Sequence, residues 1–120
     1  MYAAYDFYRD SYGGGQILPD DWPLLARQVD AYIDLVTYGR LQRGAPVTDA
    51  VRRAACAAAE VQQAQQKAGR TVGVQSESVG SQSVTYENAE EREKRESAEL
   101  MEAIDLHLPP WDPLRYAGVR

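Results

Sequence analysis

Apolar residues recur at helical spacing in three stretches of the chain. The first stretch follows Asp20, a residue type that caps helix N-termini, and Pro23, which the first turn of a helix tolerates. It stops before Gly39, and glycine is preferred just beyond a helix C-terminus. This pattern predicts a helix over residues 20–38, with its apolar face formed by Leu25, Val29, Tyr32, Ile33 and Val36.

The second stretch lies between Thr48, an expected N-cap, and Gly69, an expected closing residue. Its centre is an alanine-rich seam that contains Cys56, the only cysteine of the chain. Small side chains allow another helix to approach closely. The pattern therefore predicts a tightly packed central helix over residues 48–68, with Cys56 as a buried structural thiol.

A charged third helix is predicted over residues 88–106, with Asn88 as its N-cap. The N-terminal half of this helix has almost no apolar side chains, whereas the second half carries Leu100, Met101 and Ile104. We therefore expect only the second half to be buried in the monomer.

Residues 71–86 differ from the rest, because small polar and apolar residues alternate there with a period of two. The segment has too little apolar area to be stable as an isolated hairpin. We expect two short strands that project from the helical body and pair with a neighbouring subunit or docking protein, or else a mobile loop. The residues expected to make that pairing are Val74, Val79, Gly80, Val84 and Tyr86.

The N-terminal segment, residues 1–19, is rich in aromatic side chains and contains the glycine run 13–15. Four of the eight tyrosines and the only phenylalanine precede residue 13, which is too many rings for a flexible linker. We expect an extended or partly helical arm that ends in a flexible joint at the glycines. Its rings pack either on the core of the same subunit or on a neighbouring subunit.

The C-terminal tail, residues 107–120, holds three prolines after residue 108 that prevent the third helix from continuing. Its bulky side chains are of the kind that anchors interfaces and have no obvious place in so small a core. We expect this tail to be poorly ordered in the free subunit and to dock on a partner, unless Trp111 folds back on the third helix. The expected docking residues are Trp111, Leu114, Arg115 and Tyr116.

Taken together, the pattern predicts a mainly α protein: a small helical bundle over residues 20–106, an extended or β-hairpin segment at about 71–86, and extended terminal arms. A length of 120 residues allows one domain at most, and so small a core often gains stability by oligomerisation. No segment is apolar enough to cross a membrane or to act as a secretory signal. We therefore expect a soluble, intracellular, oligomeric protein.

The sequence offers little chemistry for catalysis or for metal binding. Cys56 and His107 are the only residues of their types, which excludes a disulfide framework and a multi-histidine or CxxC metal site within one chain. His107 lies at the end of the third helix, where the helix dipole favours an imidazolium, or else it is exposed. No nucleophile–base pair or phosphate loop is present, so we expect no enzyme, no cofactor and no metal.

Charge is unevenly distributed along the chain, whose net charge is −5. Residues 1–38 carry a net −4, residues 39–70 a net +4, and residues 87–105 a net −5. Opposite faces of this kind suit head-to-tail association of identical subunits, although charges can also cluster without such a role. The expected contact pairs basic side chains with acidic ones of a neighbour: Arg40, Arg43, Arg52 and Arg53 with Glu91, Glu99 and Glu102.

Several motifs occur in a fixed order along residues 2–106. They are the aromatic arm with its glycines, the end of the first helix (Thr-Tyr-Gly-Arg at 37–40), the Ala-Cys-Ala centre at 55–57, and Ser-Glu-Ser-Val-Gly at 76–80 followed by Ser-Val-Thr-Tyr at 83–86. Together they resemble the head–tail connector proteins (adaptor or head-completion proteins) of bacteriophages with long non-contractile tails.

The resemblance implies a helical subunit that forms a ring, commonly of twelve copies, beneath the portal protein at the capsid vertex of the virion. DNA passes through such a ring without specific binding, and we expect acidic residues of the first or third helix to line that channel. A stopper or tail-completion protein docks below, and a C-terminal segment often docks on the portal. The rigid stretch 109–113 departs from the leucine-rich helix end of the family.

A different class of protein also fits the residues. In this alternative the chain is a small helical regulatory or antitoxin-like protein whose aromatic arm binds one partner. The mass of the native protein distinguishes the two classes, because a connector forms a large ring and a regulator is a monomer or dimer.

Overall fold

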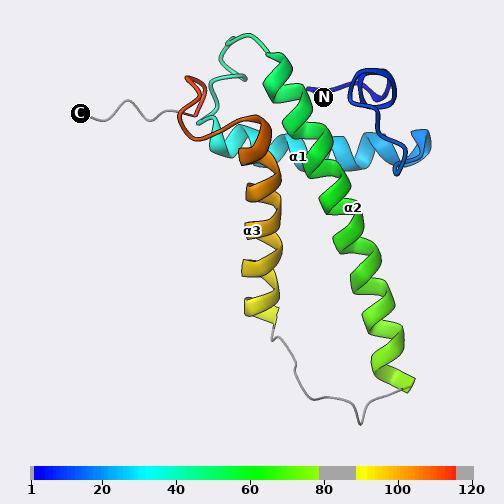
Figure 1. Ribbon diagram of the computed structural model, residues 1–120. Helices are drawn as coiled ribbons and strands as arrows, with labels where there is room; N and C mark the ends of the chain where they lie inside the picture. Colours follow the sequence, from blue (N-terminus) through cyan, green and yellow to red (C-terminus); the bar gives the residue numbers. More distant parts are fainter. Residues whose placement is uncertain (1, 79–88, 116–120) are drawn as a thin grey trace.

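The computed structural model describes residues 2–78 and 89–115, and it shows a mainly α protein (Figure 1). The described residues contain no β-strand. Three α-helices form a small bundle, and two single-turn elements precede them in the chain. The elements are the π-helix η1 (Phe7–Ser11), the 3-10 helix η2 (Pro19–Asp21), α1 (Trp22–Val36), α2 (Asp49–Ser78) and α3 (Ala89–His107).

Helix α2 is the central element, since it packs against both α1 and α3. Figure 1 shows α1 running across the two longer helices, which lie close together near α1 and separate toward the opposite end. The core lies where the three helices meet and also takes in the N-terminal segment and the end of the tail. Its largest fully buried side chains are Tyr8, Ile17, Trp22, Ile33, Leu100, Ile104 and Leu108.

The predicted first helix is confirmed as α1, with both ends two residues inside the predicted range. Asp20 does not cap it, because the chain enters through the 3-10 turn η2. At the other end, the Tyr38 amide donates to the Leu35 carbonyl (3.3 Å) and the Gly39 amide to the Asp34 carbonyl (2.9 Å). This is a Schellman motif in which Tyr38, at φ 56°, takes the left-handed position that the sequence assigns to Gly39.

The N-terminus of the second helix and its alanine seam are confirmed. The Thr48 hydroxyl accepts a hydrogen bond from the Val51 amide (3.3 Å), which satisfies one of the free donors at the start of α2. The small residues from Ala54 to Ala59 are all buried, Cys56 completely. This seam lets α1 and α3 approach α2 closely.

The predicted end of the second helix is wrong, because α2 continues through Gly69 as far as Ser78. Residues 71–78, which include Val74, are therefore helical and not a strand. Glycine in a helix interior costs only about 1 kcal/mol, and extending an existing helix needs no new nucleus. The other residues of the predicted hairpin, Val79, Gly80, Val84 and Tyr86, lie outside the described residues, as does Asn88.

The third helix is confirmed as α3, as is the burial of its second half alone. Residues 90–95 are exposed all round the helix, whereas Leu100 and Ile104 are buried against α2 and the core. The apolar spacing continues to Leu108, which is also buried although it follows the last helical residue.

The aromatic arm packs on the core of its own subunit, which confirms that alternative of the two. Tyr8 is fully buried, and its ring stacks on that of Trp22 with the centroids 4.9 Å apart. The Trp22 indole N–H donates to the Ala3 carbonyl (3.0 Å), and the Tyr5 hydroxyl donates to the Ile17 carbonyl (2.8 Å). The arm is thus part of the bundle.

The glycine run at residues 13–15 is not the flexible joint that the sequence predicts. The buried Tyr8 hydroxyl accepts hydrogen bonds from the amides of Gln16 (2.9 Å) and Ile17 (3.1 Å), just after the run. The same hydroxyl donates to a carboxylate oxygen of Glu60 on α2 (2.9 Å). Burial and that carboxylate raise the pKa of Tyr8. The chain therefore wraps closely around one ring, and a residue without a side chain, Gly14, faces it.

Candidate docking surfaces

Two arginines hold the C-terminal tail against its own subunit. Arg40 Nη1 donates to the carbonyls of Pro113 (2.7 Å) and Leu114 (2.9 Å). Arg115 Nη1 donates to the Leu108 carbonyl (2.9 Å) and to a carboxylate oxygen of Asp105. The expectation of a poorly ordered tail is therefore wrong for residues 108–115, and Tyr116 lies outside the described residues.

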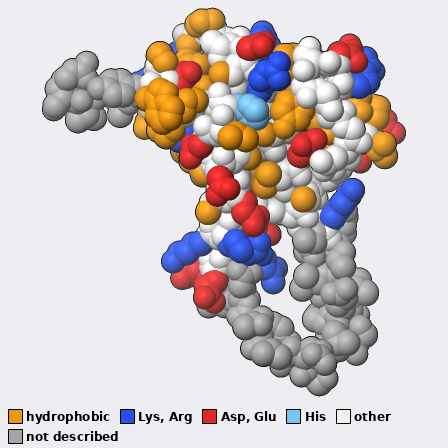
Figure 2. All heavy atoms as spheres, viewed as in Figure 1, with side chains coloured by type: hydrophobic (Ala, Val, Ile, Leu, Met, Phe, Trp, Pro, Cys, Tyr) orange, Lys and Arg blue, Asp and Glu red, His pale blue; other side chains and the backbone are white. Residues whose placement is uncertain are grey.

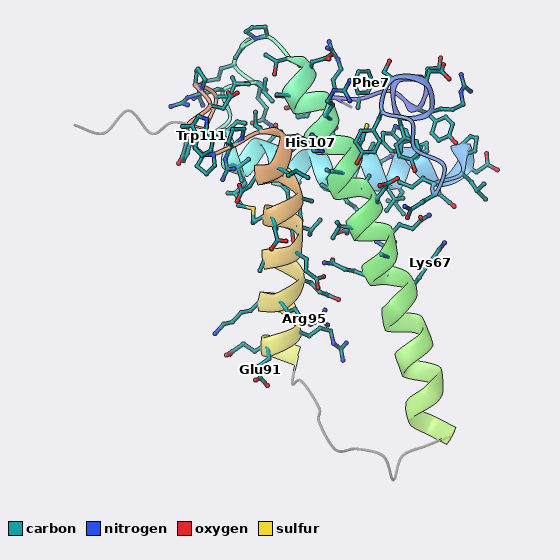
Figure 3. All side chains as sticks on the ribbon, viewed as in Figure 1. Phe7, Lys67, Glu91, Arg95, His107 and Trp111 are labelled. Atoms are coloured by element: carbon teal, nitrogen blue, oxygen red, sulfur yellow. The ribbon has the colours of Figure 1, made fainter. Side chains whose placement is uncertain are left out.

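The same contacts separate the predicted docking residues into buried and exposed ones. Leu114 is buried in the core of its own subunit, which the sequence does not predict. Trp111 is 77% exposed and lies at the edge of the bundle (Figure 3), so it does not fold back on α3. Tyr38, whose ring lies 5.2 Å from the Arg40 guanidinium carbon, is also exposed, as is Leu106. We call Tyr38, Leu106 and Trp111 the tail corner.

The predicted basic contact residues divide between internal and external roles. Arg40 is engaged by the tail, as described above. Arg52 and Arg53 each lie near the Asp49 carboxylate, at 3.6 and 3.8 Å, in partly exposed pairs. Arg53 also lies 5.9 Å from the Phe7 ring centroid, and Arg43 is exposed. Surface pairs of this kind contribute only ~0–1 kcal/mol, so they leave Arg52 and Arg53 free to meet another subunit.

The predicted acidic contact residues, Glu91, Glu99 and Glu102, are all exposed on α3. They do not form a purely acidic surface, because acidic and basic side chains are intermixed on the outer half of this helix (Figure 2). Glu99 accepts hydrogen bonds from Arg95 (3.2 Å) and from the Gln65 side chain (2.9 Å). Their contact with a neighbouring subunit stays a prediction.

A polar groove of about 370 Å³ lies between α2 and α3, on the side of α1. Its α2 wall is formed by glutamines, which the sequence analysis does not single out. Gln62 and Gln66 each donate an amide hydrogen bond to the Gln28 side-chain oxygen of α1, at 3.1 and 3.0 Å, and Gln65 donates to the Glu96 carbonyl (2.9 Å). The lining residues are Tyr32, Gln62, Gln65, Gln66, Glu93, Glu96, Ser97 and Leu100.

Cys56 and His107, the two residues with the greatest potential reactivity, are both at least partly buried by packing within the subunit. Burial raises the pKa of the Cys56 thiol to about 12, so the thiol stays protonated. His107 is half-buried, with its ring 6.0 Å from that of Tyr12. Burial and the nearby Arg53 charge lower the pKa of His107, which disfavours the imidazolium that the helix dipole would stabilise. Desolvation and a like charge outweigh the helix dipole there.

We expect Cys56 to be unreactive toward iodoacetamide at pH ~8 in the folded protein, because its thiol is protonated and inaccessible. Unfolding in guanidinium chloride should expose the thiol and restore an ordinary alkylation rate, measured by mass spectrometry. Rapid alkylation of the folded protein at the same pH would show that the alanine seam opens readily.

Within the described residues, no group of three His, Cys, Asp or Glu side chains is placed to hold a metal ion. No helix in the same part of the chain is both long and apolar enough to cross a bilayer. Comparison with known proteins gives no match, whether to a family model, a curated protein or a solved structure. The function is therefore inferred from the sequence and the surfaces of this chain alone.

Proposed function

We propose that this protein is a head–tail connector subunit of a tailed bacteriophage. In this proposal it forms a ring beneath the portal protein, lines the DNA channel and joins the capsid to the tail. The observation that carries the proposal is the tail corner, where the chain fixes its own C-terminal tail and leaves the Trp111 side chain 77% exposed. The order of motifs along residues 2–106 supports this class of protein by resemblance.

Exposed Trp111 is suited to anchor an interface with the portal. Tryptophan is enriched among the residues that dominate binding energy, since it buries a large area with few rotatable bonds. Arg40 and Arg115 hold the backbone on either side of it, and Leu114 is inserted in the core. Docking therefore costs little additional backbone entropy, which favours a strong contact over a small area.

Charged residues exposed on different helices support assembly into a ring. Arg52 and Arg53 lie at the start of α2, and the acidic residues of α3 lie farther along the bundle. We propose that they meet between neighbouring subunits, a head-to-tail contact that closes a ring when its rotation permits. Each pair contributes only ~0.2–1 kcal/mol, but a ring repeats it at every interface. The net charge of −5 disfavours tight DNA binding, as a conduit requires.

The regulatory alternative has less support from the fold. It relies on the aromatic arm to bind a partner, whereas the structure packs Tyr8 and Ala3 of that arm into the core of the same subunit. Releasing the arm would expose Trp22 and remove its hydrogen bond to Ala3.

The test is the native mass of the purified protein, alone and mixed with its portal, together with negative-stain images. We expect a large ring, and we expect Trp111→Ala to weaken portal binding by at least roughly 30-fold, since anchor residues contribute about 2 kcal/mol or more. Leu18→Ala is the matched control, because Leu18 is 65% exposed but lies outside the tail corner, and this change should leave portal binding as in the wild type. A monomer or dimer that does not bind the portal would contradict the connector and favour the regulator.

A further inference from the structure

Most of the fully exposed residues of α1 are apolar. Leu24 is 56% exposed and Leu35 is 71% exposed, on a helix whose other side forms the core. Surface helices normally turn charged and polar residues outward. Arg27 is the only charged residue among those exposed on α1, and it has no ion pair or hydrogen bond in the described structure. We define the α1 face as these exposed residues: Pro23, Leu24, Arg27, Ala31 and Leu35.

The groove between α2 and α3 has the complementary chemistry. Its lining includes no Lys or Arg side chain, and the carboxylates of Glu93 and Glu96 have no cation partner within the described residues. The amide groups of its glutamines already donate to Gln28, Glu96 and Glu99, which leaves the glutamine carbonyl oxygens as acceptors. Tyr32 and Leu100 also line the groove and contribute its apolar atoms. Such a site fits a cation that offers several N–H donors on an apolar stem.

A guanidinium meets this description better than any other protein group. It offers five N–H donors, is always charged and is weakly hydrated, so it suits an interface that excludes water. The groove volume of about 370 Å³ is at the lower end of the range for small-ligand sites, roughly 300–1,000 Å³, and leaves room for the stem of Arg27. A free small cation would fill the groove but would leave the α1 face uncovered.

We propose that the α1 face of one copy of this chain packs on the groove of a second copy, with Arg27 inserted between the partner's α2 and α3. Both surfaces belong to the same chain and differ from each other, so the contact is head-to-tail and repeats around a ring. It places an arginine and two leucines, Leu24 and Leu35, at the centre of the interface, with charged residues of α3 at its rim. This inference rests on the proposed ring.

The test compares Arg27→Glu with Arg9→Glu, an equal change of charge at an exposed arginine of the N-terminal arm, outside both proposed surfaces. We expect Arg27→Glu to weaken subunit association at least roughly 30-fold, as for an interface anchor, and Arg9→Glu to assemble as the wild type does. Analytical ultracentrifugation measures the association, and circular dichroism confirms that the helices are kept. The double variant Arg27→Glu with Glu96→Arg should restore assembly, because the two charges exchange places.

The other possible results of these experiments contradict either the proposed Arg27 contact, the connector function or both. Normal assembly of Arg27→Glu overturns the inference, and if Arg52→Glu and Arg53→Glu together abolish assembly, the proposed ring stands with a different contact. A wild-type protein that is monomeric but binds the portal also overturns this inference and leaves the connector function. A wild-type protein that neither assembles nor binds the portal contradicts both.

Discussion

Replacing Trp22 with alanine should lower the free energy of unfolding by about 3–5 kcal/mol, the usual loss for a large buried aromatic side chain. Trp22 is 1% exposed and lies at the start of α1. Its ring contacts those of Tyr5 and Tyr8, with centroids 5.9 and 4.9 Å away, and its N–H holds the Ala3 carbonyl. The substitution thus removes the surface on which the whole N-terminal arm packs.

Urea denaturation followed by circular dichroism measures this loss. Small domains have total stabilities of about 5–15 kcal/mol, so Trp22→Ala should leave the protein marginally folded. Trp111→Ala is the matched control, because the second tryptophan is mostly exposed and its removal should change stability by no more than ~0.5 kcal/mol. Equal effects of the two substitutions would mean that the arm does not depend on the Trp22 ring.

Local sequence signals predicted the helices and most of their ends. Thr48 caps α2 because its hydroxyl reaches an amide three residues later, a contact that depends on the nearest neighbours alone. The alanine seam around Cys56 likewise indicates close packing wherever the helix lies. The C-terminal end of α2 was not predictable in this way, since Gly69 is a preferred end signal but only a weak penalty inside a helix.

Whether the C-terminal tail packs on its own subunit depends on a residue far away in the sequence. Leu114 and Trp111 are both apolar residues near prolines, and nothing local distinguishes the buried one from the exposed one. The tail carbonyls of residues 113 and 114 are bound by Arg40, which is 73 and 74 residues distant along the chain. The charge pattern predicts that Arg40 contacts a neighbouring subunit, because a count of charges cannot identify a backbone carbonyl as a partner.

The groove between α2 and α3 could not be predicted from the sequence for a related reason. Its glutamines, Gln62, Gln65 and Gln66, lie close together along α2, which is the one signal that could have drawn attention to this helix. Uncharged amides do not enter a count of charges, and their role depends on α1 and α3 providing Gln28 and Glu96 opposite them. No local signal distinguishes Arg27 either, because the exposed leucines near it on α1 are evident only in the structure.

Alanine at position 14 should destabilise the protein by about 1–3 kcal/mol, as overpacking of a well-packed core does. A Cβ atom added to Gly14 would lie 2.2 Å from two atoms of the buried Tyr8 ring, a distance that real contacts do not reach. The ring cannot retreat, because its hydroxyl is held by Glu60 and by the amides of residues 16 and 17.

The matched control is Gly15→Ala, one residue further along the same glycine run. A Cβ there meets nothing within 4 Å, and the backbone of Gly15 does not have the positive φ of Gly13. The added methyl group should therefore be neutral, or should stabilise the protein by up to ~1 kcal/mol through a smaller unfolded-state entropy. Thermal unfolding of the two variants should thus shift in different directions from the wild type. If Gly14→Ala melted at or above the wild-type temperature, Tyr8 would have to be free to move, and the arm would not be the close-packed part of the core that the structure shows.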